Sequence, residues 1–149
     1  MPYAVITGAT QGIGKAVAEK FLHEGFSVAI CARSADDLSA WQQKWQTQYP
    51  SAKVLCLKSD FSNKTETISF GEQVLNLFPQ IDILVNNAGI FLPGNLATEP
   101  DGHLETLMSV NLLSAYHLTR KILPQMKKQQ SGHIFNMCSV ASLKAYPNG

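Results

Sequence analysis

Short apolar segments alternate with longer mixed segments along the whole chain. Five of the apolar segments are rich in valine and isoleucine, which is typical of strands buried on both faces of a parallel sheet. They cover residues 3–7, 27–32, 53–58, 81–86 and 133–137. The pattern therefore predicts strands separated by helices.

The first predicted helix follows a glycine-rich turn. Ile13, Val17 and Phe21 recur at four-residue spacing, which predicts a buried face. Gly25 comes shortly after, and a glycine in the left-handed conformation commonly ends a helix. We therefore expect a first unit of strand, glycine turn and helix.

The second predicted helix begins at Ser34. A serine hydroxyl can accept a free backbone N–H at a helix start, and Asp36 and Asp37 suit the positive helix end. These aspartates are therefore interpreted as capping residues rather than catalytic ones. Trp41 and Trp45 lie one helical turn apart, and we expect them to pack onto the sheet.

Two more helices are predicted over residues 63–78 and 103–128. Strands that alternate with helices imply right-handed crossovers and a parallel sheet covered on both sides. The expected fold class is α/β, a doubly wound, Rossmann-like parallel sheet with its first five strands present, in a single domain over residues 1–149. The predicted buried stripe of the longer helix consists of Leu104, Leu107, Met108, Leu112 and Ala115.

Composition narrows the classes of partner. The chain has 149 residues, 45% of them hydrophobic and 15% charged, with a net charge of +1. So little net charge creates no field that would gather nucleic acid or anionic lipid, and no apolar stretch approaches the length of a membrane span. We expect a cytoplasmic protein with neither a nucleic-acid nor a membrane partner.

Cysteines and histidines show no metal-binding or disulfide pattern. Cys31, Cys56 and Cys138 lie in short apolar runs without paired spacing, so they are expected to be buried thiols. The four histidines lack ligand spacing as well. No metal site is predicted; the histidines are His23, His103, His117 and His133.

The glycine turn after the first strand is the first candidate site. Glycines allow a sharp turn, and the following helix start offers free N–H groups and a positive dipole end, which suits a dinucleotide pyrophosphate. The spacing is G-x-x-x-G-x-G, from Gly8 through Gly12 to Gly14. The alternative is a turn that only joins a strand to a helix.

Four motifs in order make the chain resemble the short-chain dehydrogenase/reductase family. Thr7-Gly8-x-x-x-Gly12-Ile13-Gly14 is similar to the cofactor loop of that family, and Asn86-Asn87-Ala88-Gly89 to the motif after its fourth strand. Asn111 matches its mid-helix asparagine. Asn136-x-x-Ser139 matches the strand that ends in its catalytic serine. These matches cover nearly all of the chain.

The resemblance implies a set of cofactor contacts. The backbone of the glycine turn would hold the pyrophosphate, residues 87–89 would line the ribose and nicotinamide, and Asp60 would accept from the adenine amino group beside Phe61. Asp60 could instead cap the next helix, as could Ser62. The implied cofactor-binding residues are Gly8, Thr10, Gln11, Gly12, Ile13, Gly14, Asp60, Phe61, Asn87, Ala88 and Gly89.

Arg33 bears on the choice between NAD and NADP. A carboxylate at the end of the second strand favours NAD, whereas this chain has Ala32 followed by Arg33. A guanidinium suits a 2′-phosphate, so NADP is the predicted cofactor. A solvated surface arginine is the alternative, and Gln11 stands where some NADP-preferring relatives carry a basic residue.

The resemblance also implies catalytic roles. Ser139 would hydrogen-bond the substrate oxygen, and the backbone of Asn111 would hold a water in a proton relay. The tyrosine and lysine of the family motif are expected beyond Gly149, together with the remaining strands. Tyr146 follows Ser139 too closely to take the tyrosine's role. Cys138 is expected to be a small buried strand residue.

The resulting hypothesis is an NADP-dependent enzyme that transfers a hydride between the nicotinamide and a small-molecule carbonyl or alcohol, such as a ketone or a 3-oxoacyl group. The family relationship also implies a homodimer or homotetramer. The alternative is a dinucleotide-binding sensor or scaffold module without catalysis, which would explain the absence of the tyrosine and lysine.

Overall fold

The computed structural model describes residues 1–144 and contains one parallel sheet with helices on both faces. The strands are β1 (Tyr3–Thr7), β2 (Ser27–Ala32), β3 (Val54–Lys58), β4 (Ile83–Asn86) and β5 (His133–Asn136). All four pairings are parallel, in the order β3-β2-β1-β4-β5. The predicted doubly wound sheet is confirmed, with β3, β4 and β5 each slightly shorter than predicted.

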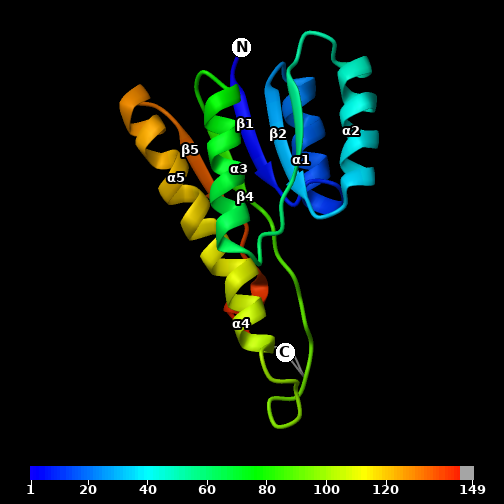
Figure 1. Cartoon of the computed structure of the whole chain (residues 1–149), viewed down its shortest axis with the longest axis vertical. Helices are drawn as coiled ribbons and strands as arrows, with labels where there is room; N and C mark the ends of the chain where they lie inside the picture. The colour runs from blue at the N-terminus through cyan, green and yellow to red at the C-terminus, as the bar shows by residue number, and fades with distance from the viewer. Residues whose placement is uncertain (145–149) are drawn as a thin grey trace.

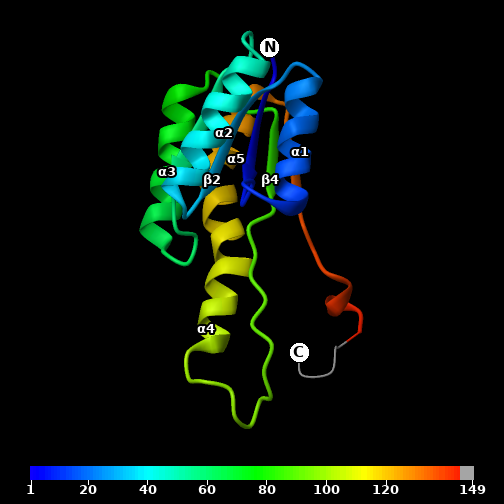
Figure 2. The same cartoon turned by 90° about the vertical axis from the view of Figure 1, so that its right-hand side faces the viewer.

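Two groups of helices cover the sheet. They are α1 (Gly12–His23), α2 (Ala35–Gln48), α3 (Lys64–Leu77) and α5 (Ser114–Gln129), whereas the short helix α4 (His103–Met108) has no buried residue. Side chains of α1 and α2 share one core cluster with the strands, and those of α3 and α5 share the other. Figure 1 shows α3 beside α5, and Figure 2 shows α1 on the opposite side of the sheet.

The helix starts follow the predicted capping chemistry only in part. The Ser34 hydroxyl accepts the Asp37 N–H at 3.3 Å, as predicted for α2. The cap of α3 is Asn63, whose side chain accepts the N–H groups of Thr65 and Glu66. Neither Asp60 nor Ser62, the two residues proposed for this role, caps α3.

The buried face of α1 differs from the predicted one by one residue. Gly14, Ala18 and Leu22 are buried, whereas the side chain of Ile13 is 62% exposed. Gly14 and Ala18 are small enough to let the helix backbone approach the sheet, so that stripe faces inward. The predicted end is confirmed, because α1 stops at His23 and Gly25 has a φ of 82°.

Trp45 is fully buried against α1 and the sheet, as predicted. Its indole N–H donates to Glu19 at 3.3 Å. Trp41 is half-buried, and the ammonium groups of Lys15 and Lys44 lie over its ring. The tryptophan pair therefore joins α2 to α1 as well as to the sheet.

The predicted helix over residues 103–128 is interrupted by a π-helical turn at Ser109–Leu113. The side chains of Leu104, Met108 and Leu112 are exposed, so the predicted buried stripe is wrong. The helix carries two apolar stripes, and only contact with the sheet and α3 decides which is covered. The buried stripe consists of Val110, Ser114, Leu118, Ile122 and Met126.

The segment between β4 and α4, together with α4 itself, extends beyond the carboxyl ends of the strands in both views (Figures 1 and 2). Within residues 1–144, no helix combines the length and the apolar character that a membrane crossing requires. The sheet edge that faces this extended segment carries the candidate site.

Candidate functional site

A cleft of about 510 Å³ opens at the carboxyl edge of the sheet. β1 lies between β2 and β4, so the strand order reverses there, and open α/β sheets bind ligands at such a reversal. The cleft is lined by Gly8, Thr10, Gln11, Cys31, Ala32, Arg33, Ser34, Asp37, Ser59, Asp60, Phe61, Ser62, Asn87, Ala88, Gly89, Ile90, Thr106 and Val110.

Thr7 joins the ends of β1 and β4. Its hydroxyl oxygen accepts the backbone N–H groups of Asn87 and Ala88 at 2.9 and 2.8 Å. The Asn87 amide in turn donates to the carbonyl oxygens of Thr7 and Gly8 at 2.9 and 3.0 Å. These four bonds lock the turn after β4 onto the glycine turn, as expected for an asparagine turn that connects neighbouring strands.

Gly14 fits under this corner because it has no side chain. A Cβ atom there would lie 2.5 Å from the Gly8 carbonyl oxygen and closer still to the Asn87 amide nitrogen. Gly8 has a φ of 64° and packs against Ala88: a Cβ added to Gly8 would lie 3.0 Å from the Ala88 Cα. The glycine spacing therefore has a structural cause: it brings the start of α1 against the two strand ends.

Arg33 and Asp60 lie at the ends of β2 and β3. The backbone N–H and hydroxyl of Ser62 lower the pKa of Asp60, with a smaller contribution from the positive charge of Arg33. Both Ser62 bonds reach the same oxygen, Oδ1. The Asp60 Oδ2 accepts no hydrogen bond from residues 1–144, and Arg33 forms no ion pair among them.

Ser59 is a residue of the cleft lining that the sequence did not point to. The residue is buried, it lines the cleft, and its hydroxyl oxygen has no hydrogen-bond partner within residues 1–144. Buried hydroxyls are normally paired, and this oxygen is itself fully buried, so it is not presented to the cleft. The only sequence signal was its position at the end of a predicted strand.

Asn111 lies in the π-helical turn and holds the loop after β4. Its side chain accepts the Ile90 N–H at 2.8 Å and donates to the Ile90 carbonyl at 2.9 Å. Gly89 packs beside it, since a Cβ there would lie 3.4 Å from the Asn111 side-chain oxygen. π-Helical turns interrupt helices most often at functional sites. The side chain thus makes long-range contacts, whereas the prediction concerned its backbone.

Ser139 follows β5 and lies at the start of a short 3-10 turn, Val140–Ser142. Its hydroxyl oxygen accepts the Ala141 N–H at 3.1 Å, and the residue is exposed. The prediction of a buried Cys138 is wrong: β5 ends at Asn136, and the Cys138 side chain is exposed. No element among residues 1–144 packs over it. Cys31 is buried as predicted and Cys56 is half-buried.

The structure brings most of the predicted cofactor residues into the cleft. Those that line it are Gly8, Thr10, Gln11, Arg33, Asp60, Phe61, Asn87, Ala88 and Gly89. Gly12 and Ile13 form the exposed start of α1, and Gly14 lies beneath the turn. Asn111 and Ser139 do not line the cleft, and Tyr146 lies outside the described residues.

The helix-covered parallel sheet, with its cleft where the strand order reverses, defines a Rossmann-like protein. A family model described as short chain dehydrogenase matches residues 2–149. The chain therefore belongs to the short-chain dehydrogenase/reductase family, and the family resemblance is confirmed.

Proteins named for a dehydrogenase activity are similar to this chain over nearly its whole length. A 2-(R)-hydroxypropyl-CoM dehydrogenase of Xanthobacter autotrophicus is 36% identical over 97% of this chain and 58% of its own length. The structure of an alcohol dehydrogenase from Thermococcus sibiricus, complexed with 5-hydroxy-NADP, has a TM-score of 0.93 and 29% identity, and it covers 100% of this chain and 63% of its own.

A metagenomic short-chain oxidoreductase in complex with NADP has a TM-score of 0.90 and 32% identity, covering 99% of this chain and 66% of its own. The chain spans between 52% and 60% of the length of the curated relatives it matches. Similarity over this part of the relatives does not by itself establish the activity of the whole protein.

Proposed function

We propose that this chain is the cofactor-binding part of a single-domain, NADP-dependent oxidoreductase that acts on a carbonyl or alcohol substrate. The interlocked corner of Thr7, Gly14 and Asn87 carries the proposal, because it leaves the glycine turn open towards the cleft while holding it rigidly. A preorganised turn at a helix start suits the pyrophosphate of a dinucleotide.

The cleft also fits the adenosine end of such a cofactor. The free Oδ2 of Asp60 can accept from an adenine amino group. Phe61 is buried at the same end and packs edge-on against Phe70. These features support the assignment of Asp60 and Phe61 to the adenine subsite.

Arg33 supports NADP over NAD. Its side chain is exposed at the rim of the cleft, free of ion pairs with the described residues, and a guanidinium can bind a 2′-phosphate through two parallel hydrogen bonds. Two similar proteins of known structure are complexed with NADP or 5-hydroxy-NADP. Gln11, Thr10 and Gly8 line the same cleft and are proposed to contact the phosphates with Gly12 and Ile13.

The proposed chemistry needs few groups from this chain. The bound nicotinamide supplies or accepts the hydride. Ser139 orients the substrate oxygen, and its hydroxyl must turn from the Ala141 N–H to do so. Asn111 holds the Ile90 backbone, so Asn87, Ala88 and Gly89 keep their places on the nicotinamide side while the Asn111 backbone holds a relay water.

Association through the long helix is proposed as well, as a homodimer or homotetramer. The side chains of Leu104, Met108, Leu112 and Leu113 are exposed along α4 and the π-helical turn. A row of exposed apolar residues of this kind is typical of an interaction surface.

The substitution Ser139→Ala tests the proposed reaction in the protein expressed from its complete gene. It should lower kcat for ketone reduction with NADPH by about a hundredfold, since one preorganised donor to a developing oxyanion is removed. The affinity for NADPH should stay within about twofold, because Ser139 lies outside the cleft. Turnover equal to that of the wild type would refute the role. NADPH binding without any turnover in the wild type would favour the sensor or scaffold alternative.

The substitution Arg33→Asp tests the cofactor assignment. It should weaken NADPH binding by about a hundredfold and leave NADH binding unchanged or improved, because a carboxylate repels a 2′-phosphate and can accept from a 2′-hydroxyl. Titration of both cofactors by fluorescence measures the effect, with Lys58→Asp as the control for a charge change on the neighbouring strand. Equal affinities for NADPH and NADH before mutation would overturn the assignment.

A further inference from the structure

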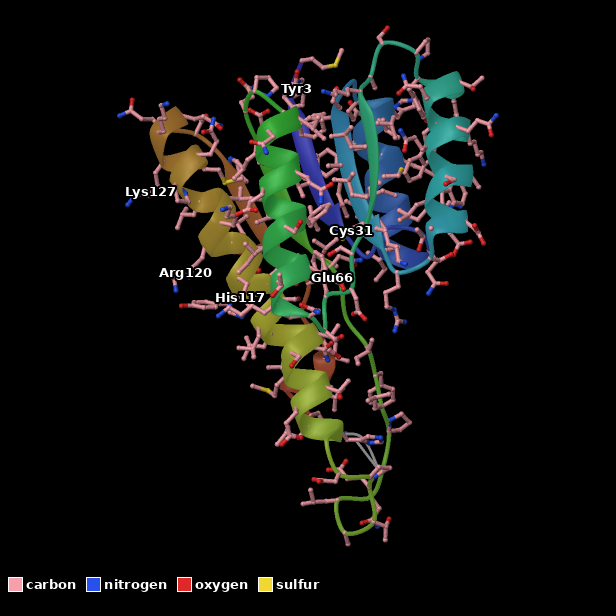
Figure 3. All side chains as sticks on the ribbon, in the orientation of Figure 1. Tyr3, Cys31, Glu66, His117, Arg120 and Lys127 are labelled. Carbon is pink, nitrogen blue, oxygen red and sulfur yellow. The ribbon has the colours of Figure 1, made fainter. Side chains whose placement is uncertain are left out.

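A second cavity, of about 420 Å³, lies between α3 and α5 and shares no residue with the candidate cleft. We call it the basic pocket. Figure 3 shows two of its residues, His117 and Arg120, on α5 beside the lower end of α3. It is lined by Lys64, Ile68, Tyr116, His117, Arg120 and Lys121.

The pocket arises from the way the two helices cross. They touch at Gly71, where a Cβ would lie 2.9 Å from the Lys121 Cγ and 3.1 Å from the Leu118 Cδ1. Crossing helices diverge away from their contact point. Lys64 begins α3 two turns before Gly71, and the space that opens at that end is the pocket.

Positive charge in the pocket is largely uncompensated. The Lys121 ammonium is paired with Glu72 at 2.6 Å. Lys64 and Arg120, in contrast, form no ion pair with any residue of the described part, 1–144. In a chain with a net charge of only +1, two free cations around one cavity are a local feature rather than an overall basic character.

Arg120 is held in position. Its guanidinium donates to the Tyr116 hydroxyl at 3.2 Å and lies 5.7 Å from the centre of the Tyr116 ring. Burial lowers the pKa of His117, and the charges of Lys64 and Arg120 lower it further. Lys64 and Arg120 are therefore both close enough to His117 to disfavour its charged form, and a bound anion would offset their two positive charges.

We propose that the basic pocket binds the phosphate group of a small phosphorylated metabolite at a site separate from the dinucleotide. Lys64 and Arg120 bind the phosphate oxygens, one as a point charge and the other as a fork of donors. His117 donates a further hydrogen bond. Ile68 and the Tyr116 ring form the apolar wall against which the remainder of the metabolite packs.

Inorganic phosphate is the probe, titrated at constant ionic strength into the protein expressed from its complete gene. The protein is first saturated with whichever of NADPH or NADH it binds, so that the phosphate subsites of the cofactor are filled. Backbone amide NMR shifts of α3 and α5 should then saturate. Arg120→Gln and Lys64→Gln should each weaken phosphate binding about tenfold, since each removes a charge-assisted hydrogen bond.

Lys127→Gln is the matched control, because it removes one positive charge from the same helix about two turns away from the pocket (Figure 3). It should change phosphate affinity by less than about twofold. The proposal is overturned if the shifts do not saturate, if saturable shifts appear only in a parallel titration without cofactor, or if Lys127→Gln acts like Arg120→Gln. It is also overturned if Arg120→Gln alters only the oligomeric state, since the charges would then serve a subunit contact.

Discussion

The two ends of the candidate site are built differently. At the glycine turn, Thr7, Gly14 and Asn87 come from β1, α1 and the turn after β4. Thr7 and Asn87 are joined by partly buried bonds across eighty positions, and Gly14 packs closely beneath them. At Ser139, the hydroxyl bonds a neighbour two residues away and is exposed. The cofactor end is thus held by tertiary contacts, whereas the serine end is held by local ones.

Substitutions at the two ends are therefore expected to affect different properties of the protein. A substitution at the glycine turn should unfold the corner and remove cofactor binding together. A substitution at Ser139 should change the reaction with little effect on folding. We therefore expect the loss in the free energy of unfolding to be largest for substitutions at the glycine turn and smallest for those at Ser139.

Gly14→Ala should have the largest effect, lowering the free energy of unfolding by about 3 kcal/mol. The added Cβ would overlap the Gly8 carbonyl oxygen and the Asn87 amide, and neither can move without breaking the corner. Urea denaturation measures the change. Gly89→Ala is the control, since its Cβ would meet only an ordinary contact at 3.4 Å. Equal losses in the two variants would contradict the proposed role of close packing.

Thr7→Val should lower the free energy of unfolding by about 2 kcal/mol, because the Asn87 and Ala88 N–H groups lose their shared acceptor. Thr7→Ser should recover most of the loss. Ser139→Ala removes a hydroxyl from the other end and should cost less than about 1 kcal/mol, because water replaces its single bond. Thermal and urea unfolding of the three variants provide the comparison. Similar losses for Thr7→Val and Ser139→Ala would break the contrast between the ends.

The dependence of folding stability on pH should differ between the buried Cys31 and the exposed Cys138. Burial raises the pKa of Cys31 from 9.0 to about 12, so the folded state holds this proton more tightly than the unfolded state. The associated stability is therefore complete below about pH 9 and is lost as the pH rises towards 12, with a loss of about 1 kcal/mol by pH 10.

Urea unfolding at pH 8 and pH 10 measures that loss. Cys31→Ala should reduce the difference between the two pH values, whereas Cys138→Ala, which removes an exposed thiol, should leave it unchanged. An unaltered difference in Cys31→Ala would show that other groups account for the alkaline loss.

Continuous apolar runs and fixed spacings were predicted well. The five strands were found because buried parallel strands are continuous apolar runs, and the glycine turn because its spacing is fixed by backbone approach. Errors occurred where two faces of an element are both apolar. On α1, the most buried stripe is that of Gly14, Ala18 and Leu22. Of the predicted face, Val17 and Phe21 are partly buried against the core and only Ile13 is exposed.

In the candidate site, too, local patterns were predicted and long-range contacts were not. Sequence pointed to Asn87 and Asn111 as candidate site residues, but not to their partners, because the bonds to Thr7 and Ile90 span many positions and leave no periodic signal. Cys138 was misplaced because an apolar run does not mark where strand pairing ends. The π-helical turn that contains Asn111 was also unpredicted, because the apolar pattern continues through it without interruption.

By itself, the sequence determined the order of strands and helices, the position of the glycine turn and membership of the short-chain dehydrogenase/reductase family. These depend on short-range patterns that any chain with the same spacing would share. Only the tertiary structure decided which apolar stripes are buried, that Thr7 and Asn87 close the corner over Gly14, and that Lys64 and Arg120 face one cavity. Those outcomes depend on distances between segments, which packing sets and local sequence does not encode.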